Sequence, residues 1–375
     1  MGHDMKIALV GDIAFFGRKC LASNPAFGKS IEAVARYLKS HDVVIGNLEA
    51  PFVDNHRAVG AKSAHVASDK ANITLLTQLG VTHVTLANNH IMDFGVDAFT
   101  MTKNLLNQAG IVCFGVNKEE VRLDCGGNKV AMLGFCSYNT NPNDTSFGAV
   151  GAINITDATV IANRLKETRA AGYLCILASH SGQEHVHMPG RDDINFARSL
   201  AAQGDYIYYG HHPHVIQGYE QVENAHIYYS LGNFVFDDVY TSKSSEPLVK
   251  MSEANKTGLI VSLEVTDSKV VAQDCVPIYN GDDGFKLGDD VVGFSMKPYN
   301  DLLALPEVDY SELRKSKIDE FMLGRKAKRN LAWYLQRMRP ASAFMILNAR
   351  RNARLYQEHF ESKLSGLSAS NGDKA

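Results

Sequence analysis

The stretch AAQGDYIYYGHHPHVIQG, residues 201–218, contains the features that decide the fold. A segment with the pattern of a helix ends at Gly204, an apolar run follows, and three histidines come directly after that run. Glycine after a helix adopts the left-handed conformation at little cost, and Ile and Tyr favour a strand. The stretch therefore predicts a helix, a buried strand, and imidazoles at the carboxyl end of that strand.

The same order of helix, glycine and strand occurs three more times. It is found as LLTQLG before VTHVTLA, as LLNQAG before IVCFGV, and as TRAAG before YLCILAS. This alternation predicts an α/β protein whose strands are buried on both faces. The segments 129–136, 258–265 and 269–278 leave no room for intervening helices, so we expect antiparallel additions or a second sheet there.

Polar side chains follow five of the predicted strands. The carboxyl ends of parallel strands share one edge of an open sheet, so we expect these side chains to converge. Carboxylate and amide oxygens together with neutral imidazoles suit Mn, Fe or Zn. Each residue taken alone fits an ordinary turn, cap or core position, but the joint pattern predicts a metal site. The residues are Asp12, Glu49, Asn88, Asn89, His90, His180, His211, His212 and His214.

The HHPH segment predicts which of its imidazoles are ligands. In an extended segment alternate side chains share a side, so His212 and His214 point together and His211 points away. Pro213 restricts its own φ and favours an extended His212. We therefore expect His212 and His214 to be ligands and His211 to pack beside them.

A second histidine-rich loop, HSGQEHVHMPGRDD, follows at 180–193. Glu184 is either an acid that orients a ligand histidine or a solvated loop residue, and the sequence leaves both open. His185 and Arg191 are candidate contacts for a phosphate group of the substrate. We expect this loop to form a wall of the site.

Charge is unevenly distributed along the chain. The net charge is -3, but residues 311–375 contain 14 Lys and Arg against 6 Asp and Glu, a net +8 that leaves about -11 for the remainder. The acidic body offers no continuous basic track, which disfavours nucleic acid as a partner. Scattered cysteines and the lack of an apolar run long enough to span a bilayer predict a cytoplasmic protein, with membrane association through the tail as an alternative.

Five motifs, in order, resemble those of the CapA family of capsule and poly-gamma-glutamate synthesis proteins, within the calcineurin-like metallophosphoesterase superfamily. The resemblance covers about residues 5–240. It implies a four-layer α-β-β-α sandwich of the metallophosphoesterase type as domain 1–300, followed by a basic, mostly helical extension, 301–375. The motifs are GNLEAPF, LANNHIMDFGVDAF, HSGQEH, GHHPHVIQGYE and YSLGNFVFD.

The resemblance also implies a centre of two divalent metal ions. Asp12 and His214 would bind the first ion, Glu49 would bridge both, and His90 would donate a proton to the leaving group. The second ion would be bound by Asn89, His180 and His212. The superfamily begins with Asp-x-His where this chain has Asp12-Ile13-Ala14, so the first ion lacks a ligand and a single ion is an alternative. Ser181 also stands where an aromatic residue is common.

These features predict a metal-dependent hydrolase, a phosphoesterase acting on a small molecule or polymer in capsule, exopolysaccharide or poly-gamma-glutamate synthesis. Two alternatives stay open: a non-catalytic or weakly catalytic assembly component, and an amide-bond hydrolase on the same centre. The basic, aromatic-rich segment 325–360 is either a helical hairpin packed on the body or a surface for an anionic membrane or a partner.

Overall fold

Two β-sheets lie face to face in the computed structural model, which describes residues 4–60, 62–116, 120–142, 157–240, 246–282, 284–327 and 340–372. The larger sheet contains β1 (Met5–Ile13), β2 (Val43–Leu48), β5 (His83–Thr85), β6 (Val112–Phe114), β13 (Asn233–Val235), β14 (Thr257–Thr266), β15 (Lys269–Gly281) and β16 (Gly284–Leu287). Its order is β16-β15-β14-β1-β2-β5-β6, and β13 pairs with β1. Strands β1, β2, β5 and β6 are parallel, and β14 to β16 are the predicted antiparallel additions.

The smaller sheet has the order β11-β12-β10-β9-β8-β7. Its four central strands pair in parallel, and β7 and β11 pair antiparallel at the two edges. A short parallel pair, β3 (Phe52–Val53) and β4 (Ser68–Asp69), lies outside both sheets. The strands of the smaller sheet are β7 (Val121–Cys125), β8 (Asn128–Cys136), β9 (Leu174–His180), β10 (Tyr206–His211), β11 (Tyr219–Val222) and β12 (Ala225–Tyr228).

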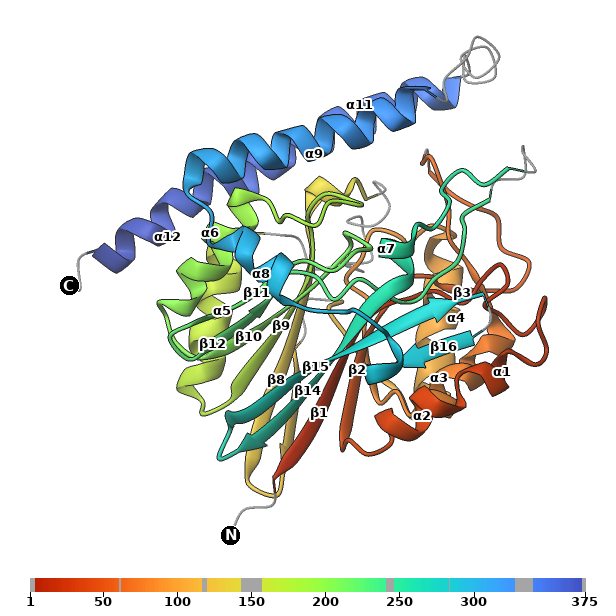
Figure 1. Ribbon diagram of the computed structural model, residues 1–375, viewed down its shortest axis with the longest axis horizontal. Helices are drawn as coiled ribbons and strands as arrows, with labels where there is room; N and C mark the ends of the chain where they lie inside the picture. Colours follow the sequence, from red (N-terminus) through yellow and green to blue (C-terminus); the bar gives the residue numbers. More distant parts are fainter. Residues whose placement is uncertain are drawn as a thin grey trace.

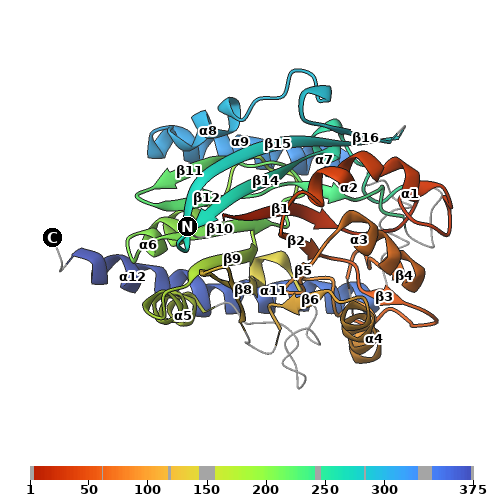
Figure 2. The same ribbon diagram turned by 90° about the horizontal axis from the view of Figure 1, so that it is seen from below.

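Helices cover the outer face of each sheet, on opposite sides of the molecule (Figures 1 and 2). The larger sheet packs against α1 (Phe27–Ser30), α2 (Glu32–Leu38), α3 (Ile73–Leu79) and α4 (Gly95–Gln108). The smaller sheet packs against α5 (Ala158–Ala170) and α6 (Arg191–Ala201). Between the sheets lies a third apolar cluster that includes Ile7, Ile207 and Val261. The predicted four-layer α-β-β-α sandwich with a helical C-terminal extension is confirmed.

The glycines that the sequence places between helices and strands have the expected backbone conformation. Gly80, Gly110, Gly172 and Gly204 all have positive φ, between 73° and 126°. Each follows one of the helices α3 to α6 and precedes β5, β6, β9 or β10, respectively. Because all four crossovers lead into parallel strands, the carboxyl ends of these strands lie at one end of each sheet.

The C-terminal helices lie across the end of the molecule opposite the N-terminus (Figure 1). They are α8 (Lys297–Leu303), α9 (Glu307–Ala327), α11 (Pro340–Tyr356), the π-helical turn η5 (Gln357–Glu361) and α12 (Ser362–Gly372). Tyr310, Tyr356 and Phe360 are buried in the cluster that joins these helices to the smaller sheet. The described residues therefore form helices packed on the body, whereas 328–339 lie outside the described residues.

The remaining short elements are α7 (Glu253–Lys256) and the 3-10 turns η1 (Lys70–Asn72), η2 (Tyr138–Thr140) and η4 (Gly288–Asp290). In the part of the chain that the structure describes, no helix has the length and apolar character to cross a bilayer. The domain boundary at residue 300 stays a prediction, and α8 runs across that position.

A buried histidine in the larger sheet makes stability depend on pH. His83 is 8% exposed, and burial lowers the pKa of its imidazole to about 4. The unfolded chain takes up this proton near pH 6.5 and the folded chain does not, so stability is complete above pH 6.5 and falls as the pH drops through 4. We expect His83 to account for about 3 kcal/mol of that loss.

Replacing His83 by glutamine should remove this part of the acid sensitivity. Urea unfolding at pH 7 and at pH 4.5 measures it, because the free energy of unfolding should fall less in the variant than in the wild type. An equal fall in both proteins would show that His83 is not buried in its neutral form.

Candidate metal centre

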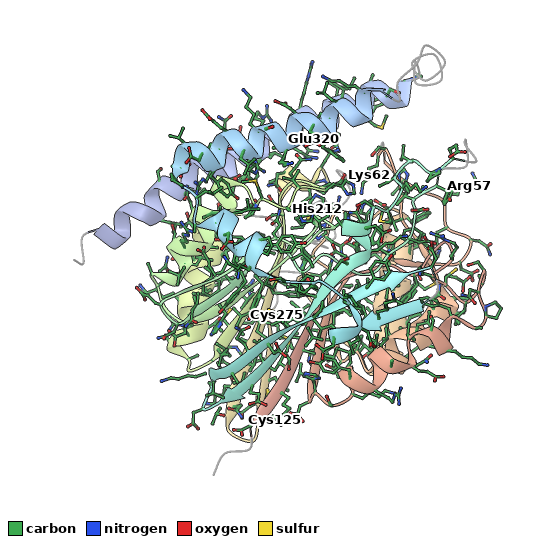
Figure 3. All side chains as sticks on the ribbon, in the orientation of Figure 1. Arg57, Lys62, Cys125, His212, Cys275 and Glu320 are labelled. Carbon is green, nitrogen blue, oxygen red and sulfur yellow. The ribbon has the colours of Figure 1, made fainter. Side chains whose placement is uncertain are left out.

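The carboxyl ends of strands from both sheets meet at one site. Asp12 of β1 lies in register with Asn47 of β2, and His180 of β9 lies in register with His211 of β10. The loop after β5 adds Asn89 and the turn after β2 adds Glu49. Figure 3 shows His212 beneath the C-terminal helices, with Lys62 at the same end of the molecule and Cys125 at the opposite end.

Three overlapping groups of buried side chains place their ligand atoms within 4.8 Å of one another. Glu49 belongs to two of them and joins the side contributed by β1 to the side contributed by the smaller sheet. Asn89 Oδ1 lies 3.0 Å from His180 Nε2, which adds an amide oxygen beside the second group. All six residues predicted as ligands are thus brought together. The groups are Asp12, His180 and His211; Glu49, His180 and His212; and Asp12, Glu49 and His214.

The donor atoms fit a divalent cation. Glu49 is fully buried, and neither of its carboxylate oxygens has a hydrogen-bond partner among the described residues. His211 Nε2 and His212 Nδ1 are likewise buried without such a partner. A buried carboxylate without hydrogen bonds is strongly unfavourable, and a metal ion removes that penalty by accepting its lone pairs. Glu49 is therefore the residue that most directly indicates a metal site.

Charge and burial set the protonation of the cluster. Burial raises the pKa of Glu49 to about 8. Burial also lowers the pKa of His211 to about 4 and of His212 to about 3, so both rings are neutral donors at pH 7. Burial alone would lower the pKa of His214, but the charges of Glu49 and Asp12 raise it to about 10. His214 is therefore a cation at pH 7, with Nδ1 3.3 Å from Asp12 Oδ2 and Nε2 3.5 Å from Glu49 Oε1.

The prediction that His211 points away from His212 and His214 was wrong in its geometry. Strand β10 ends at His211, and His212 and His214 have φ values of 100° and 57°. Side chains do not alternate through such a turn, and the predicted extended conformation of His212 before Pro213 is absent. His211 Nδ1 lies 2.9 Å from His180 Nδ1, inside the cluster. All three imidazoles of the HHPH segment face the site, and strained backbone of this kind is common at functional sites.

Asparagine side chains orient the carboxylates and imidazoles. Asn47 Nδ2 donates to Asp12 Oδ1 over 2.7 Å, and Asn88 Nδ2 donates to Asn47 Oδ1 over 3.0 Å. Asn233 Oδ1 lies 2.8 Å from His214 Nδ1. Asn88 Oδ1 also accepts the backbone N–H of His90, so the structure places Asn88 between Asn47 and the turn that carries His90. Hydrogen bonds from such neighbouring groups fix the orientation of a ligand imidazole and decide which of its nitrogens carries the proton.

His90 is held between the cluster and a buried ion pair. Its Nδ1 lies 2.6 Å from Asp93 Oδ2, and its Nε2 lies 3.9 Å from Glu49 Oε1. Lys62 reaches the same place from the loop before β4, with Nζ 2.9 Å from Asp93 Oδ1 and 3.1 Å from His90 Nδ1. The Asp93 contact leaves Nε2 as the ring atom that faces the metal-ligand cluster.

The ion pair of Lys62 and Asp93 should contribute strongly to stability. The two side chains are 6% and 0% exposed. Replacing Lys62 by methionine leaves the Asp93 charge buried, so the free energy of unfolding should fall by about 3–5 kcal/mol. Chemical denaturation measures this loss. The control is Lys70→Met, which removes an exposed pair with Asp54 and should cause no resolvable change. Equal effects of the two substitutions would contradict the buried network.

The loop after His180 lies against the C-terminal helices. The ring of His185 lies 6.2 Å from that of His214 and 5.2 Å from that of Phe321 in α9. Glu184 is close enough to raise the pKa of Glu49 and His214, which places its charge near the cluster. Arg191 instead stacks on Tyr310, with the guanidinium carbon 4.1 Å from the ring centre, and pairs with Glu307. Its described contacts are with α9, so the structure does not bring Arg191 to the metal ligands.

The Asp12-Ile13-Ala14 departure removes one expected histidine from the Asp12 side of the site. Ala14 is buried in a small apolar cluster with Phe236 and Met251. The ring of Phe236 lies 4.7 Å from that of His214. Asp12 lies in two groups of three donors, one with Glu49 and His214 and one with His180 and His211. The group of Glu49, His180 and His212 has Asn89 Oδ1 beside His180 as a further oxygen.

Two important residues of this site were not predicted. Asp93 stands three positions after His90 in NNHIMD, and a carboxylate at that spacing is a signal that could have identified it. Lys62 lies in GAKSAHV, where nothing in the local pattern marks it. Its contacts with Asn89, His90 and Asp93 arise only from the tertiary fold.

Comparison with known proteins identifies the family. The family model described as bacterial capsule synthesis protein PGA_cap matches residues 6–238, which is more than half of the chain. The chain belongs to this family. The matched range contains all the predicted ligands of this PGA_cap protein and ends before the C-terminal helices, which begin at α8.

Two relatives of this PGA_cap protein come from Bacillus. It is 27% identical over 261 residues to the capsule biosynthesis protein CapA of Bacillus anthracis, a match that covers 66% of this chain and 63% of the relative. It is 28% identical over 244 residues to the PGA biosynthesis protein CapA of Bacillus subtilis (strain 168), covering 61% and 64%. The match thus spans less than two thirds of the length of either relative.

Two solved structures described as nucleotidases align with parts of this chain. A putative 5'-nucleotidase from Staphylococcus aureus is 10% identical with a TM-score of 0.45, over 84% of this chain and 58% of that structure. The NAD nucleotidase of Haemophilus influenzae is 13% identical with a TM-score of 0.41, over 85% and 61%. At these values neither nucleotidase activity transfers to this PGA_cap protein.

Proposed function

We propose that this chain is a metal-dependent hydrolase that cleaves a phosphate ester during the synthesis of capsule, exopolysaccharide or poly-gamma-glutamate. The observation that carries the proposal is the buried Glu49 carboxyl group, whose oxygens have no hydrogen-bond partner among the described residues. One of its oxygens lies within 4.8 Å of ligand nitrogens of His180 and His212, and one lies within 4.8 Å of a nitrogen of His214. Membership in a capsule synthesis family supports the process, and the ligand chemistry supports the reaction class.

Each group of side chains has a separate task in this proposal. Glu49, Asn89, His180 and His212 would hold one divalent ion, and Asp12, Glu49 and His214 would hold a weaker one. When bound, such ions activate water as a nucleophile and offset negative charge on a phosphoryl group.

His90 is the residue of this chain that would move a proton. Asp93 holds its Nδ1, so Nε2 is the ring atom that would pass a proton to the leaving oxygen. Glu184 and His185 line the approach beside His214 and would orient the substrate. Lys62 keeps Asp93 ionised and in place, which fixes the ring plane of His90.

Turnover of simple esters tests this function. The full chain, stripped of metal and reloaded with Mn, is assayed against p-nitrophenyl phosphate and bis-p-nitrophenyl phosphate, with the stripped protein as control. We expect hydrolysis of at least one ester only after loading. The assay is then extended to phosphate-containing fragments of an anionic polymer. A chain that binds metal but hydrolyses none of these phosphate esters would contradict the phosphoesterase proposal.

A second candidate is a non-catalytic component of a capsule assembly system. The observation that favours it is the apolar setting of Ala14, because this position supplies no donor where the resemblance leads us to expect a histidine. The same assay separates the two candidates, since this alternative expects bound metal but no turnover. An amide-bond hydrolase on the same centre would be recognised by Mn-dependent release of glutamate from poly-gamma-glutamate while the phosphate esters stay intact.

A further inference from the structure

We propose that the outward face of α11 docks on an anionic lipid bilayer. This surface is called the α11 face below. The contacts that support the proposal are independent of the metal site and of the proposed hydrolase activity. It consists of Ala343, Phe344, Ile346, Leu347, Arg350, Arg351 and Arg354.

Hydrogen bonds to the body fix which side of α11 points outward. Asn352 is buried and its Nδ2 donates to Asn141 Oδ1 and Pro142 O, both over 2.9 Å. Asn348 donates to Pro142 O over 3.1 Å one helical turn earlier. Tyr356 is buried and bonded to Asp192 of α6. Because these three side chains lie on one side of the helix, the opposite side is held toward solvent.

The outward side combines large apolar groups with arginines. Phe344, Ile346 and Leu347 are 61%, 56% and 58% exposed. Arg350 and Arg351 are also exposed and lie one turn further along the helix. A helix of 3.6 residues per turn places Ile346, Leu347, Arg350 and Arg354 on the side opposite Asn352, with the exposed Phe344 and Arg351 at its edge. Along the helix this surface is apolar in its first half and basic in its second.

An anionic bilayer matches this chemistry. Apolar side chains enter the boundary between headgroups and acyl chains, while arginines pair with lipid phosphates. Since α11 contains no Asp or Glu, the same helix of a second copy would offer these arginines no carboxylate to pair with. The body has a net charge of about -11, so an anionic surface repels the remainder of the molecule and favours contact through the basic extension alone.

Vesicle binding by the full chain tests this docking. The wild type should bind vesicles that contain about one third phosphatidylglycerol in phosphatidylcholine, and binding should weaken as salt is raised. Replacing both Phe344 and Leu347 by glutamate should lower the partition coefficient roughly tenfold or more. The matched control replaces Val271 and Val292, which are 60% and 93% exposed and far from α11, by glutamate and should bind as the wild type does.

The outcomes are distinct from any failure of folding or of catalysis. Arg350→Glu together with Arg351→Glu changes exposed positions only and should weaken binding to a similar degree, with an unchanged melting temperature. Absence of binding by the wild type, or equal binding by the Phe344 and control variants, would overturn the docking. A wild-type dimer that Phe344→Glu dissociates, without vesicle binding, would assign the α11 face to a second copy instead.

Discussion

Replacing His90 by alanine is expected to lower metal-dependent turnover by about a hundredfold or more while leaving the metal content unchanged. His90 is buried beside the cluster, and its Nε2 lies 3.9 Å from Glu49 Oε1. It belongs to none of the three ligand groups, so its removal should not release metal. The loss of rate follows from the loss of a positioned proton donor for the leaving oxygen.

Two measurements on the same sample check this expectation: the rate against the best ester of the panel, and Mn per chain by elemental analysis. Esters with good leaving groups need less protonation, so the variant should lose less activity on a nitrophenyl ester than on an alkyl ester. The control is His41→Ala, a partly exposed ring bonded to Ser262 and remote from the site. Full activity of the His90 variant on alkyl esters would remove this residue from the mechanism.

Replacing Glu49 by glutamine is expected to have opposite effects on the metal-free and the metal-loaded protein. Burial raises the pKa of Glu49 to about 8 although the charge of His214 opposes the rise, so folding at pH 7 without a metal ion carries a penalty at this carboxyl. A carboxyl with a raised folded pKa carries no penalty below its unfolded value near 4.5, and the penalty grows as the pH rises toward 8. Glutamine removes this penalty, so the metal-free variant should be more stable than the wild type at pH 7.

The same substitution should abolish stabilisation by metal. Glu49 is shared by two ligand groups, and an amide oxygen replaces a carboxylate poorly for Mn or Zn. Thermal unfolding with and without added Mn should show a rise in midpoint for the wild type and none for the variant. Glu264→Gln, on an exposed pair with Lys6, serves as control and should keep the metal response. A metal-dependent midpoint rise in the Glu49 variant equal to that of the wild type would contradict the assigned bridging position.

Local sequence patterns predicted most of the fold. The left-handed conformation of four glycines was predictable because a glycine between a helix and an apolar run commonly ends the helix in this way. They are Gly80, Gly110, Gly172 and Gly204. The convergence of Asp12, Glu49 and Asn89 followed from the shared edge of parallel strands in one sheet. His180 and the histidines after β10 come from the smaller sheet, which that argument alone did not predict. The pairing of β14 and β15 also followed, since the segments are too close for a crossover.

Two features could not be predicted in this way. The positive φ values of His212 and His214 depend on how the chain leaves β10 near Asp12, whose Oδ2 accepts the His212 N–H over 3.3 Å. The position of Lys62 depends on a loop between β3 and β4 that folds back over the site. Both are long-range contacts, with partners that no local period reveals.

The metal content of the wild-type chain tests the central claim most directly. The protein is stripped with chelator, loaded with excess Mn, desalted and measured by elemental analysis, and the stripped protein is titrated with Mn by calorimetry. The four-donor group of Glu49, Asn89, His180 and His212 should retain about one ion per chain through desalting, and titration should reveal a second, weaker ion at Asp12 and His214. A wild-type chain that retains no Mn, Fe or Zn and shows no heat of binding would contradict the metal centre and the function built on it.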